Sequence, residues 1–372
     1  EGVEGLILDL RRNGGGSLEE AIRITGFFIP RGPVVQVRDG DGRVVIKEDR
    51  DPRMLWEGPL VVLTSRLSAS ASEIVAAALQ DYGRAVLVGD ASTHGKGTVQ
   101  APSLLRNFMR PSATLTNDPG LLKYTVSKFY RANGESTQLK GVTPDIVLPS
   151  VLNVSKDIGE SALDNPLPWD TIASAKYERL DWVAPYLEEL RRRSAARVQS
   201  CPDFAYVRED VEQFLKMQED RSISLNEQAR LREKQEQEAR RKARAKERLA
   251  RNQPEIPVRE LTLADVDKPG LPPPLTRTNR LSQVSSDPAG QVGTNDLMVA
   301  SRTASPSSGD PEETAPVDEE SDPFAPDEPL PPATDFVLRE AEMILVDYLR
   351  LWPKERSLTA RKETPAAIPA AP

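Results

Sequence analysis

The chain of 372 residues has a single cysteine, Cys201, and a single histidine, His94. One cysteine excludes an internal disulfide and a cysteine-rich zinc site. One histidine excludes a metal site made of several histidines, and any serine–histidine–aspartate triad would have to use His94. Another base, such as a lysine whose pKa is lowered by burial, is the alternative that the composition leaves open.

Long apolar runs and an excess of basic residues are also lacking. No run of about 18 apolar residues occurs, so the sequence predicts no membrane span. The net charge is −8, which disfavours a general nucleic-acid binder. There is no starting Met or signal peptide, and a strand-like run begins at Leu6, so we expect a fragment whose N-terminal part is missing.

Residues 1–150 have the pattern of a compact α/β domain. Short runs rich in Val, Leu and Ile predict buried strands at Leu6–Leu10, Val34–Val37, Leu60–Leu63 and Ala85–Val88. Helical patterns lie between them at Ser17–Phe28 and Ser70–Gln80. Alternation of this kind predicts layers of helices on a sheet.

The rest of the chain divides by composition into four parts. Residues 151–252 predict a helical extension, of which 225–251 is a charged, solvent-exposed helix. Residues 253–333 are rich in Pro, Ser, Asp and Glu and predict a disordered linker. Residues 334–353 predict a helix that docks on the folded part, and 354–372 predict a disordered tail.

A serine-rich turn follows the third predicted strand, in Ser-Ala-Ser-Ala-Ser-Glu at 68–73. A serine at a strand-to-helix turn is exposed, and the N–H groups of the helix stabilise negative charge there. Ser70 is therefore a candidate nucleophile. The spacing Ser70-x-x-Glu73 also fits an ordinary capping box, which is the plain structural alternative.

Two glycine-rich loops follow other predicted strands. Gly95-Lys96-Gly97 offers a lysine, but its spacing does not match a phosphate-binding loop, and a solvent-exposed lysine is the alternative. Gly14-Gly15-Gly16 lets the backbone approach a ligand and can present N–H groups to an oxyanion, although a plain turn fits as well. Together the three loops supply a nucleophile, a base and an oxyanion site.

Four blocks in the first 170 residues closely resemble the carboxy-terminal processing peptidases, or tail-specific proteases, a family that has a larger, periplasmic branch. The blocks are Leu-Asp-Leu-Arg-Arg-Asn-Gly-Gly-Gly (8–16), Ser-Ala-Ser-Ala-Ser-Glu-Ile (68–74), Gly-Lys-Gly-Thr-Val-Gln (95–100) and Gln-Leu-Lys-Gly-Val-Thr-Pro-Asp-Ile (138–146). Leu167-Pro168-Trp169-Asp170 resembles the start of that branch's C-terminal extension. The resemblance implies an α/β core of the ClpP/crotonase type. The family also carries a PDZ domain, and residues 1–372 contain no segment that we expect to form one.

The resemblance also implies roles for individual residues. Ser70 takes the place of the family's nucleophile, Lys96 of its general base, and Gln100 of the residue that orients the lysine. Asp81, eleven residues after Ser70, matches a position implicated in the larger branch. The implied oxyanion donors are the N–H groups of Ala71 and of Gly15 or Gly16. The loop before Gly95 is one residue longer than the family's, and His94 stands where an aromatic residue is common.

The implied function is that of a serine endopeptidase with a serine–lysine dyad, which needs no metal or other cofactor. Its expected substrates are proteins with exposed apolar C-termini, an adaptor protein is a possible partner, and the expected location is the periplasm. Two alternatives stay open: a catalytically inactive homologue that acts as a scaffold, and an α/β binding module in which Ser70 only caps a helix.

Overall fold

The computed structural model describes residues 2–108, 119–220, 222, 224–251, 256–275 and 334–353. The chain divides into two compact units, residues 1–223 with 336–372, and residues 224–335. The predicted boundary near residue 150 lies inside the first unit. Most of the predicted linker, and the predicted tail from residue 354, fall outside the described residues.

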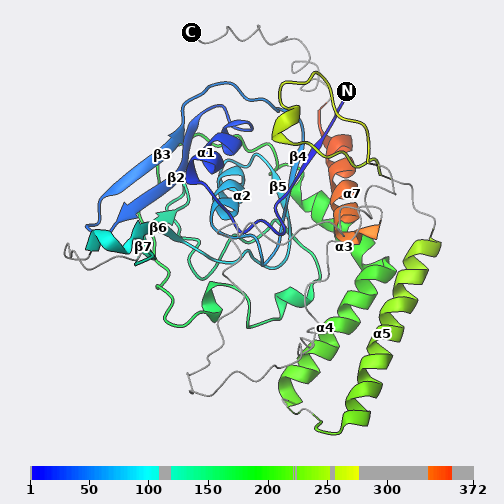
Figure 1. Ribbon diagram of the computed structural model, residues 1–372. Coiled ribbons are helices and arrows are strands. Elements are labelled where there is room, and N and C mark those ends of the chain that lie inside the picture. The colour runs from blue at the N-terminus through cyan, green and yellow to red at the C-terminus, as the bar shows by residue number, and fades with distance from the viewer. Residues whose placement is uncertain are drawn as a thin grey trace. The chain divides into compact units, whose positions relative to one another are not determined.

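The first unit carries the mixed α/β core and the helices that follow it (Figure 1). Its strands and helices are β1 (Leu6–Asp9), α1 (Leu18–Gly26), β2 (Gly32–Asp39), β3 (Val44–Asp49), β4 (Leu60–Thr64), α2 (Ala71–Asp81), β5 (Val86–Gly89), β6 (Thr98–Leu104), β7 (Leu121–Tyr130), β8 (Ile146–Val147), α3 (Leu187–Ser200), α4 (Pro202–Asp220) and α7 (Phe336–Leu351). Short 3-10 helices lie at Leu105–Phe108, Val151–Asn153 and Glu160–Ala162. The predicted α/β class is confirmed, and the four predicted strands and two predicted helices of the core are present.

The centre of the unit is a parallel sheet in the order β1-β4-β5-β8. Side chains of a strand alternate between the two faces of its sheet, and both faces here are apolar. Leu60 and Val62 of β4 pack into one cluster of buried residues, and Val61 and Leu63 pack into another. The uninterrupted apolar runs in the sequence therefore reflect burial on both sides.

Helices from distant parts of the sequence cover the two faces. On one face, α1 and α2 pack through residues such as Ile22 and Leu79. On the other face, α3 and α7 pack through Leu190, Ile344 and Tyr348, and α7 contacts both β1 and β4 (Figure 1). The helix predicted within 334–353 thus forms as α7 and supplies part of the core.

Ion pairs accompany the apolar contact between α3 and α7. Arg197 donates to Glu340 at 2.9 Å and to Asp347 at 2.6 Å, and Arg193 donates to Asp347 at 2.9 Å. Both carboxylates are buried, so they require these partners when α7 is in place.

A second, antiparallel sheet has the order β3-β2-β7-β6. Of its strands only β2 was predicted from the sequence, at Val34–Val37. The side chains of β3 and of the first half of β7 are exposed, so these strands lack the buried apolar runs on which the strand predictions depended.

The segment 167–171, where the predicted extension resembles the family, is fastened to this second sheet. Asp170 accepts hydrogen bonds from Arg38 of β2 and from Lys128 and Tyr130 of β7. The indole N–H of Trp169 donates to the Ser136 carbonyl at 2.9 Å. The extension therefore begins as part of the core.

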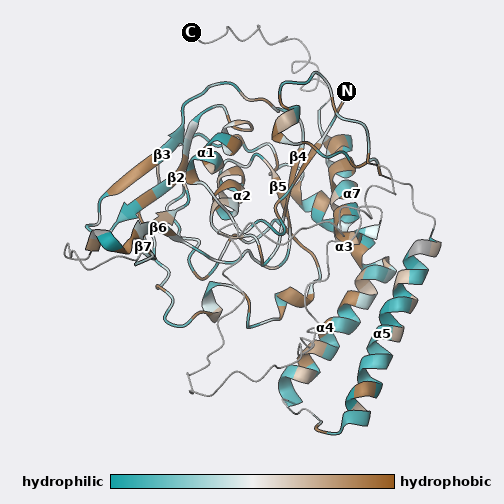
Figure 2. Ribbon diagram, viewed as in Figure 1, coloured by the Kyte–Doolittle hydropathy of each residue, from teal (hydrophilic) through white to brown (hydrophobic). Residues whose placement is uncertain are grey.

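The second unit contains α5 (Glu227–Ala250) and a 3-10 helix at Leu263–Asp265. Most residues of α5 are exposed, and Figure 2 shows this helix as largely hydrophilic. Its charged character agrees with the solvated helix predicted at 225–251. Among the described residues, no helix is apolar over a length that could span a bilayer.

Replacing Ile344 by Ala tests the contribution of α7 to the core. Ile344 is fully buried, so its truncation leaves a cavity and is expected to lower the free energy of unfolding by about 2–5 kcal/mol. Urea unfolding followed by circular dichroism measures the change. The neighbouring Met343 is 38% exposed, and Met343→Ala is the matched control, with an expected loss below about 1 kcal/mol. Equal losses in the two variants would contradict the packing of α7.

Candidate active site

The three loops singled out in the sequence meet at one edge of the parallel sheet. The Gly14–Gly16 turn follows β1, the Ser70 turn follows β4, and the Lys96 loop follows β5. These strands are parallel neighbours in the sheet. Their carboxyl ends therefore lie together, which is where open α/β sheets place their sites.

Ser70 is the residue before α2 and has an unusual backbone conformation. Its φ is 56° and its ψ is −113°, whereas an ordinary N-cap residue such as Ser17 of α1 has extended backbone, at −70° and 130°. A non-glycine residue at this positive φ is strained, and such strain is concentrated at functional sites. The Ser70 and Glu73 side chains are placed as in a capping box, and Glu73 accepts a hydrogen bond from the Ser70 N–H. No cap hydrogen bond to the Ser70 hydroxyl is formed.

The glycine turn packs directly against the Ser70 turn. A Cβ on Gly15 would lie 2.8 Å from the Ser70 Cβ and 2.9 Å from the Ala71 nitrogen, so only glycine allows this approach. The Asn13 carbonyl joins the turns, because it accepts from the Ala69 N–H at 3.1 Å and from the Ser72 hydroxyl at 2.8 Å.

The predicted oxyanion donors lie at this junction. Ala71 is the first residue of α2, and the N–H groups of a first helical turn have no acceptor within the helix. The N–H of Gly15 donates to Asn13 Oδ1 at 2.9 Å, so in this structure it is not free to donate to an oxyanion. Gly16 is exposed, and no hydrogen bond of its N–H to a described residue is present. The geometry therefore favours Ala71 with Gly16 over Ala71 with Gly15.

A single buried carboxylate, Glu73, holds the Ser70 turn and the Lys96 loop together. Its Oε2 accepts from the Ser70 N–H at 2.7 Å and from the Lys96 N–H at 3.0 Å. Its Oε1 accepts from the Thr93 hydroxyl at 2.6 Å and from the Gly95 N–H at 2.7 Å. Since both nitrogens donate to the same oxygen, the Ser70 and Lys96 backbones are at most about 6 Å apart there.

The environment of Glu73 acts on its charge in two opposing ways. Burial raises the pKa of Glu73 to about 7, and the hydrogen bonds from Thr93, Gly95, Ser70 and Lys96 oppose this rise. A carboxylate can accept all four of these hydrogen bonds, whereas a protonated carboxyl group would turn one oxygen into a donor. The ionised form is thus the one that fits the loops around it.

Lys96 is half-buried at the start of the segment that leads into β6. Burial lowers its pKa, and the like charge of Lys123 on β7 lowers it further. The carboxylates of Glu160 and Glu73 act in the opposite direction. A lysine in this environment loses its proton more readily than one in water, which a general base requires.

Two further residues of the predicted site lie differently. Gln100 is in β6 next to a break in the pairing with β7, and its side chain makes no hydrogen bond with Lys96. Asp81 is the last residue of α2, about 16 Å along the helix axis from Ser70. Asp81 is buried, and its carboxylate forms an ion pair with Arg131 at 2.6 Å. The structure thus does not bring Asp81 to Ser70, and its predicted catalytic role is not supported by direct contact.

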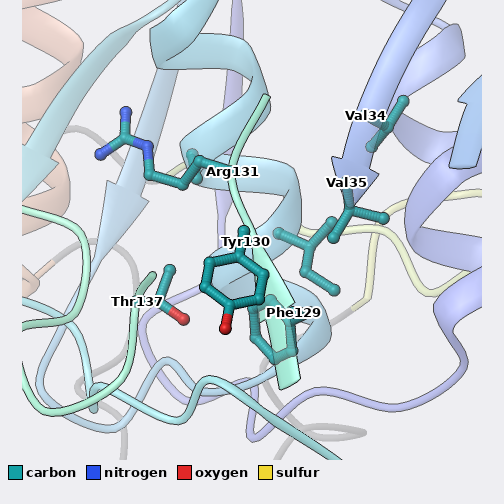
Figure 3. A pocket seen from close by; sticks show the side chains of 8 residues that line it. Val34, Val35, Phe129, Tyr130, Arg131 and Thr137 are labelled. Atoms are coloured by element: carbon teal, nitrogen blue, oxygen red, sulfur yellow. The ribbon is translucent and has the colours of Figure 1, made fainter. Parts of the chain in front are cut away.

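A small hollow lies between α2 and the second sheet. Ile74, Val35 and Phe129 are among the residues that line it. Figure 3 shows the side chains that β2 and the end of β7 contribute. It has no room for a water molecule, so it does not serve as a ligand cavity here. No group of three or more acidic, His or Cys residues in the described part of the chain could hold a metal ion.

Sequence reasoning missed how much of the site depends on Glu73. Its spacing from Ser70 was visible as a capping box, but its contacts with Thr93, Gly95 and Lys96 depend on the approach of β5 to β4. Asn13 was likewise quoted only as part of a motif. Nothing in the local sequence signals its bonds to Ala69 and Ser72.

Comparisons with known proteins match both halves of the chain. Residues 1–148 match Peptidase family S41, and residues 154–350 match the C-terminal domain of tail specific protease (DUF3340). A tail-specific protease of Haemophilus influenzae is 43% identical over 253 residues, which are 67% of this chain and 36% of that protein. A carboxy-terminal-processing protease of Bartonella bacilliformis is 40% identical over 151 residues, which are 40% of this chain and 32% of that protein.

A solved structure titled photosystem II D1 C-terminal processing protease is 33% identical, covers 40% of this chain and 35% of its own, and has a TM-score of 0.34. The α/β core and the family matches together define an S41 peptidase. Within that class, the chain belongs to the tail-specific protease family, as the match to residues 154–350 establishes. The chain spans about a third of the length of the curated relatives it matches.

Replacing Glu73 by Gln tests its role as the link between the loops. In Gln an NH2 group replaces one of the two oxygens, and an NH2 group cannot accept the two hydrogen bonds made to that oxygen. At least these two hydrogen bonds are lost, so the free energy of unfolding should fall by about 2 kcal/mol or more. Urea unfolding at pH 8 measures this. The exposed Glu19→Gln on α1 is the control and should unfold like the unmodified protein. An unchanged Glu73→Gln would show that the four contacts contribute nothing.

Proposed function

We propose that this chain carries the catalytic residues of a serine endopeptidase that cleaves proteins recognised through their C-terminal tails. The observation that carries the proposal is the strained Ser70 at the start of α2, joined through Glu73 to the loop of Lys96. Membership of the tail-specific protease family supports the substrate class, and we expect substrates with exposed apolar C-termini.

The proposed reaction begins when neutral Lys96 takes the proton of the Ser70 hydroxyl. The Ser70 oxygen attacks the scissile carbonyl, and the N–H groups of Ala71 and of the glycine turn stabilise the oxyanion. Lys96 then gives its proton to the leaving amine, and water hydrolyses the acyl-enzyme. The strained backbone places the Ser70 side chain at the strand-to-helix turn. Its hydroxyl is not held by a cap hydrogen bond to the helix.

Gln100 and Asp81 have different parts in this proposal. Gln100 orients Lys96 only after its side chain moves from its present position, because the two make no hydrogen bond here. Asp81 supports the site at a distance by fixing the end of α2 through Arg131. The family resemblance further supports a periplasmic location and an adaptor protein as a partner.

Cleavage of an unfolded protein with an apolar C-terminal tail tests the proposed function. In the protein with its complete natural chain, Ser70→Ala and Lys96→Ala are expected to abolish cleavage while both variants stay folded. The control is Ser17→Ala, which removes the ordinary cap of α1 and costs about 1 kcal/mol of stability. Cleavage by Ser70→Ala at the rate of the unmodified protein would make Ser70 a helix cap. A folded protein that never cleaves would favour the scaffold alternative.

The pH dependence of the rate tests the role of Lys96 as base. Because the neutral amine acts, the cleavage rate should rise with pH through a Lys96 pKa that lies below the ordinary lysine value. Lys123→Gln removes a like charge, raises the Lys96 pKa, and should move the rise to higher pH. A pH profile that does not respond to this change would contradict the assignment of the rise to Lys96.

A further inference from the structure

Glu160 lies beside the Lys96 loop although it is distant from that loop in sequence. It begins the 3-10 helix Glu160–Ala162, within the part that matches the tail-specific C-terminal domain and outside the part that matches the S41 peptidase. Glu160 is only 8% exposed. A buried carboxylate is costly unless it is hydrogen-bonded, so its partners show what holds it there.

The partners of Glu160 lie on both sides of Lys96. Its backbone N–H donates to the His94 carbonyl, two residues before Lys96, at 2.9 Å. Its Oε1 accepts from the Gln138 side-chain amide at 3.0 Å. The carbonyl oxygen of the same Gln138 amide accepts from the N–H of Gly97, the residue after Lys96, at 2.8 Å. Glu160 therefore holds the short segment 94–97 at both ends.

The chain is built to allow this close approach. Gly159 has a φ of 106°, and a Cβ there would lie 3.0 Å from the His94 carbonyl oxygen. The N–H of His94 in turn donates to the carbonyl of Ser68, in the block that bears the proposed nucleophile, at 2.9 Å. A continuous set of buried hydrogen bonds thus runs from Ser68 through His94, Glu160 and Gln138 to Gly97.

The His94 imidazole also faces Glu160. Its Nδ1 is buried without a hydrogen-bond partner and lies 3.8 Å from Glu160 Oε2. The extra residue in this loop and the histidine at this position were the departures from the family pattern. In this structure the histidine belongs to the contact with Glu160.

We propose that Glu160 is a positioning residue for the reaction, which holds the loop of the general base Lys96 in register with Ser70. The proposal rests on the proposed function and deepens it. The C-terminal extension then completes the catalytic centre, because one of its residues fixes the base. Gln138 shares this role, since it carries the contact from Glu160 to Gly97.

The charge of Glu160 provides a readout that a purely structural role would not move. The charged groups that act on Lys96 are Lys123 of β7, Glu73 of α2 and Glu160, and His94 lies on the same loop. Glu160 favours the protonated form of Lys96 and so raises its pKa. Replacing Glu160 by Gln removes this effect, which should lower the Lys96 pKa and shift the rise of the rate to lower pH.

The experiment compares Glu160→Ala and Glu160→Gln in the protein with its complete natural chain. Glu160→Ala loses the link to Gln138, and kcat should fall by about 10- to 100-fold with a smaller change in KM, because the base is misplaced. Glu160→Gln keeps an oxygen that accepts from Gln138, so it should recover most of kcat and show the shift of the pH profile to lower pH. The exposed Glu178→Ala is the control and should leave kcat and the profile unchanged.

A second measurement does not depend on substrate recognition, and it compares two variants so that the result does not rest on the folding of Glu160→Ala alone. The rate at which a fluorophosphonate labels Ser70, followed by mass spectrometry, reports on the serine and its base directly. The labelling rate should fall in Glu160→Ala. In Glu160→Gln, whose amide is close in size to the carboxylate, the rate should rise with pH at a lower pH than in the unmodified protein. Circular dichroism and urea unfolding identify a variant that does not fold.

The outcomes separate the two proposals. If Ser70→Ala is inactive but both Glu160 variants keep the kcat and pH profile of the unmodified protein, the positioning role is wrong and the peptidase stands. If the unmodified protein shows neither cleavage nor labelling that depends on Ser70, the proposed function fails and the role of Glu160 fails with it.

Discussion

The buried carboxylate of Glu73 is the interaction on which the rest of the site depends. It accepts four hydrogen bonds, from the residue before α2 and from three residues of the loop after β5. A carboxylate buried without such donors would be costly, so the fold is stable only when these segments converge on it. Because Ser70 and Lys96 are among the donors, the contact that satisfies the carboxylate also brings their backbones together.

Within the first compact unit, segments from the later part of the chain share one core with residues 1–150. The parallel sheet is apolar on both faces, and α7, from near residue 350, covers a face that the first 150 residues leave open. Asp170 is fastened to the second sheet, and Glu160 reaches the loop of Lys96. The part that matches the tail-specific C-terminal domain therefore contributes to the packing of the peptidase part and to the surroundings of its site.

Local patterns predicted much of the core because its strands are buried on both faces. The apolar runs at 6–10, 60–63 and 85–88 correspond to β1, β4 and β5, and the loops after them were the three that carry the site. The same reasoning missed β3, β6 and β7. The side chains of β3 and of the first half of β7 are exposed and those of β6 are mostly half-buried, so none of the three gives such a run. The family resemblance, rather than a local pattern, placed Asp81 among the site residues, and α2 separates it from Ser70 by about three turns.

The sequence by itself determined the α/β class, the family and the residues that could act as nucleophile, base and oxyanion donors, because each depends on residue types in a short segment. Only the tertiary structure decided which of them meet. Glu73, Asn13 and Glu160 act through contacts with segments about 20 to 70 residues away. The N–H of Gly15 donates to the Asn13 side chain, whereas Gly16 is exposed. Such contacts depend on how parallel strands and distant turns pack, which no local pattern contains.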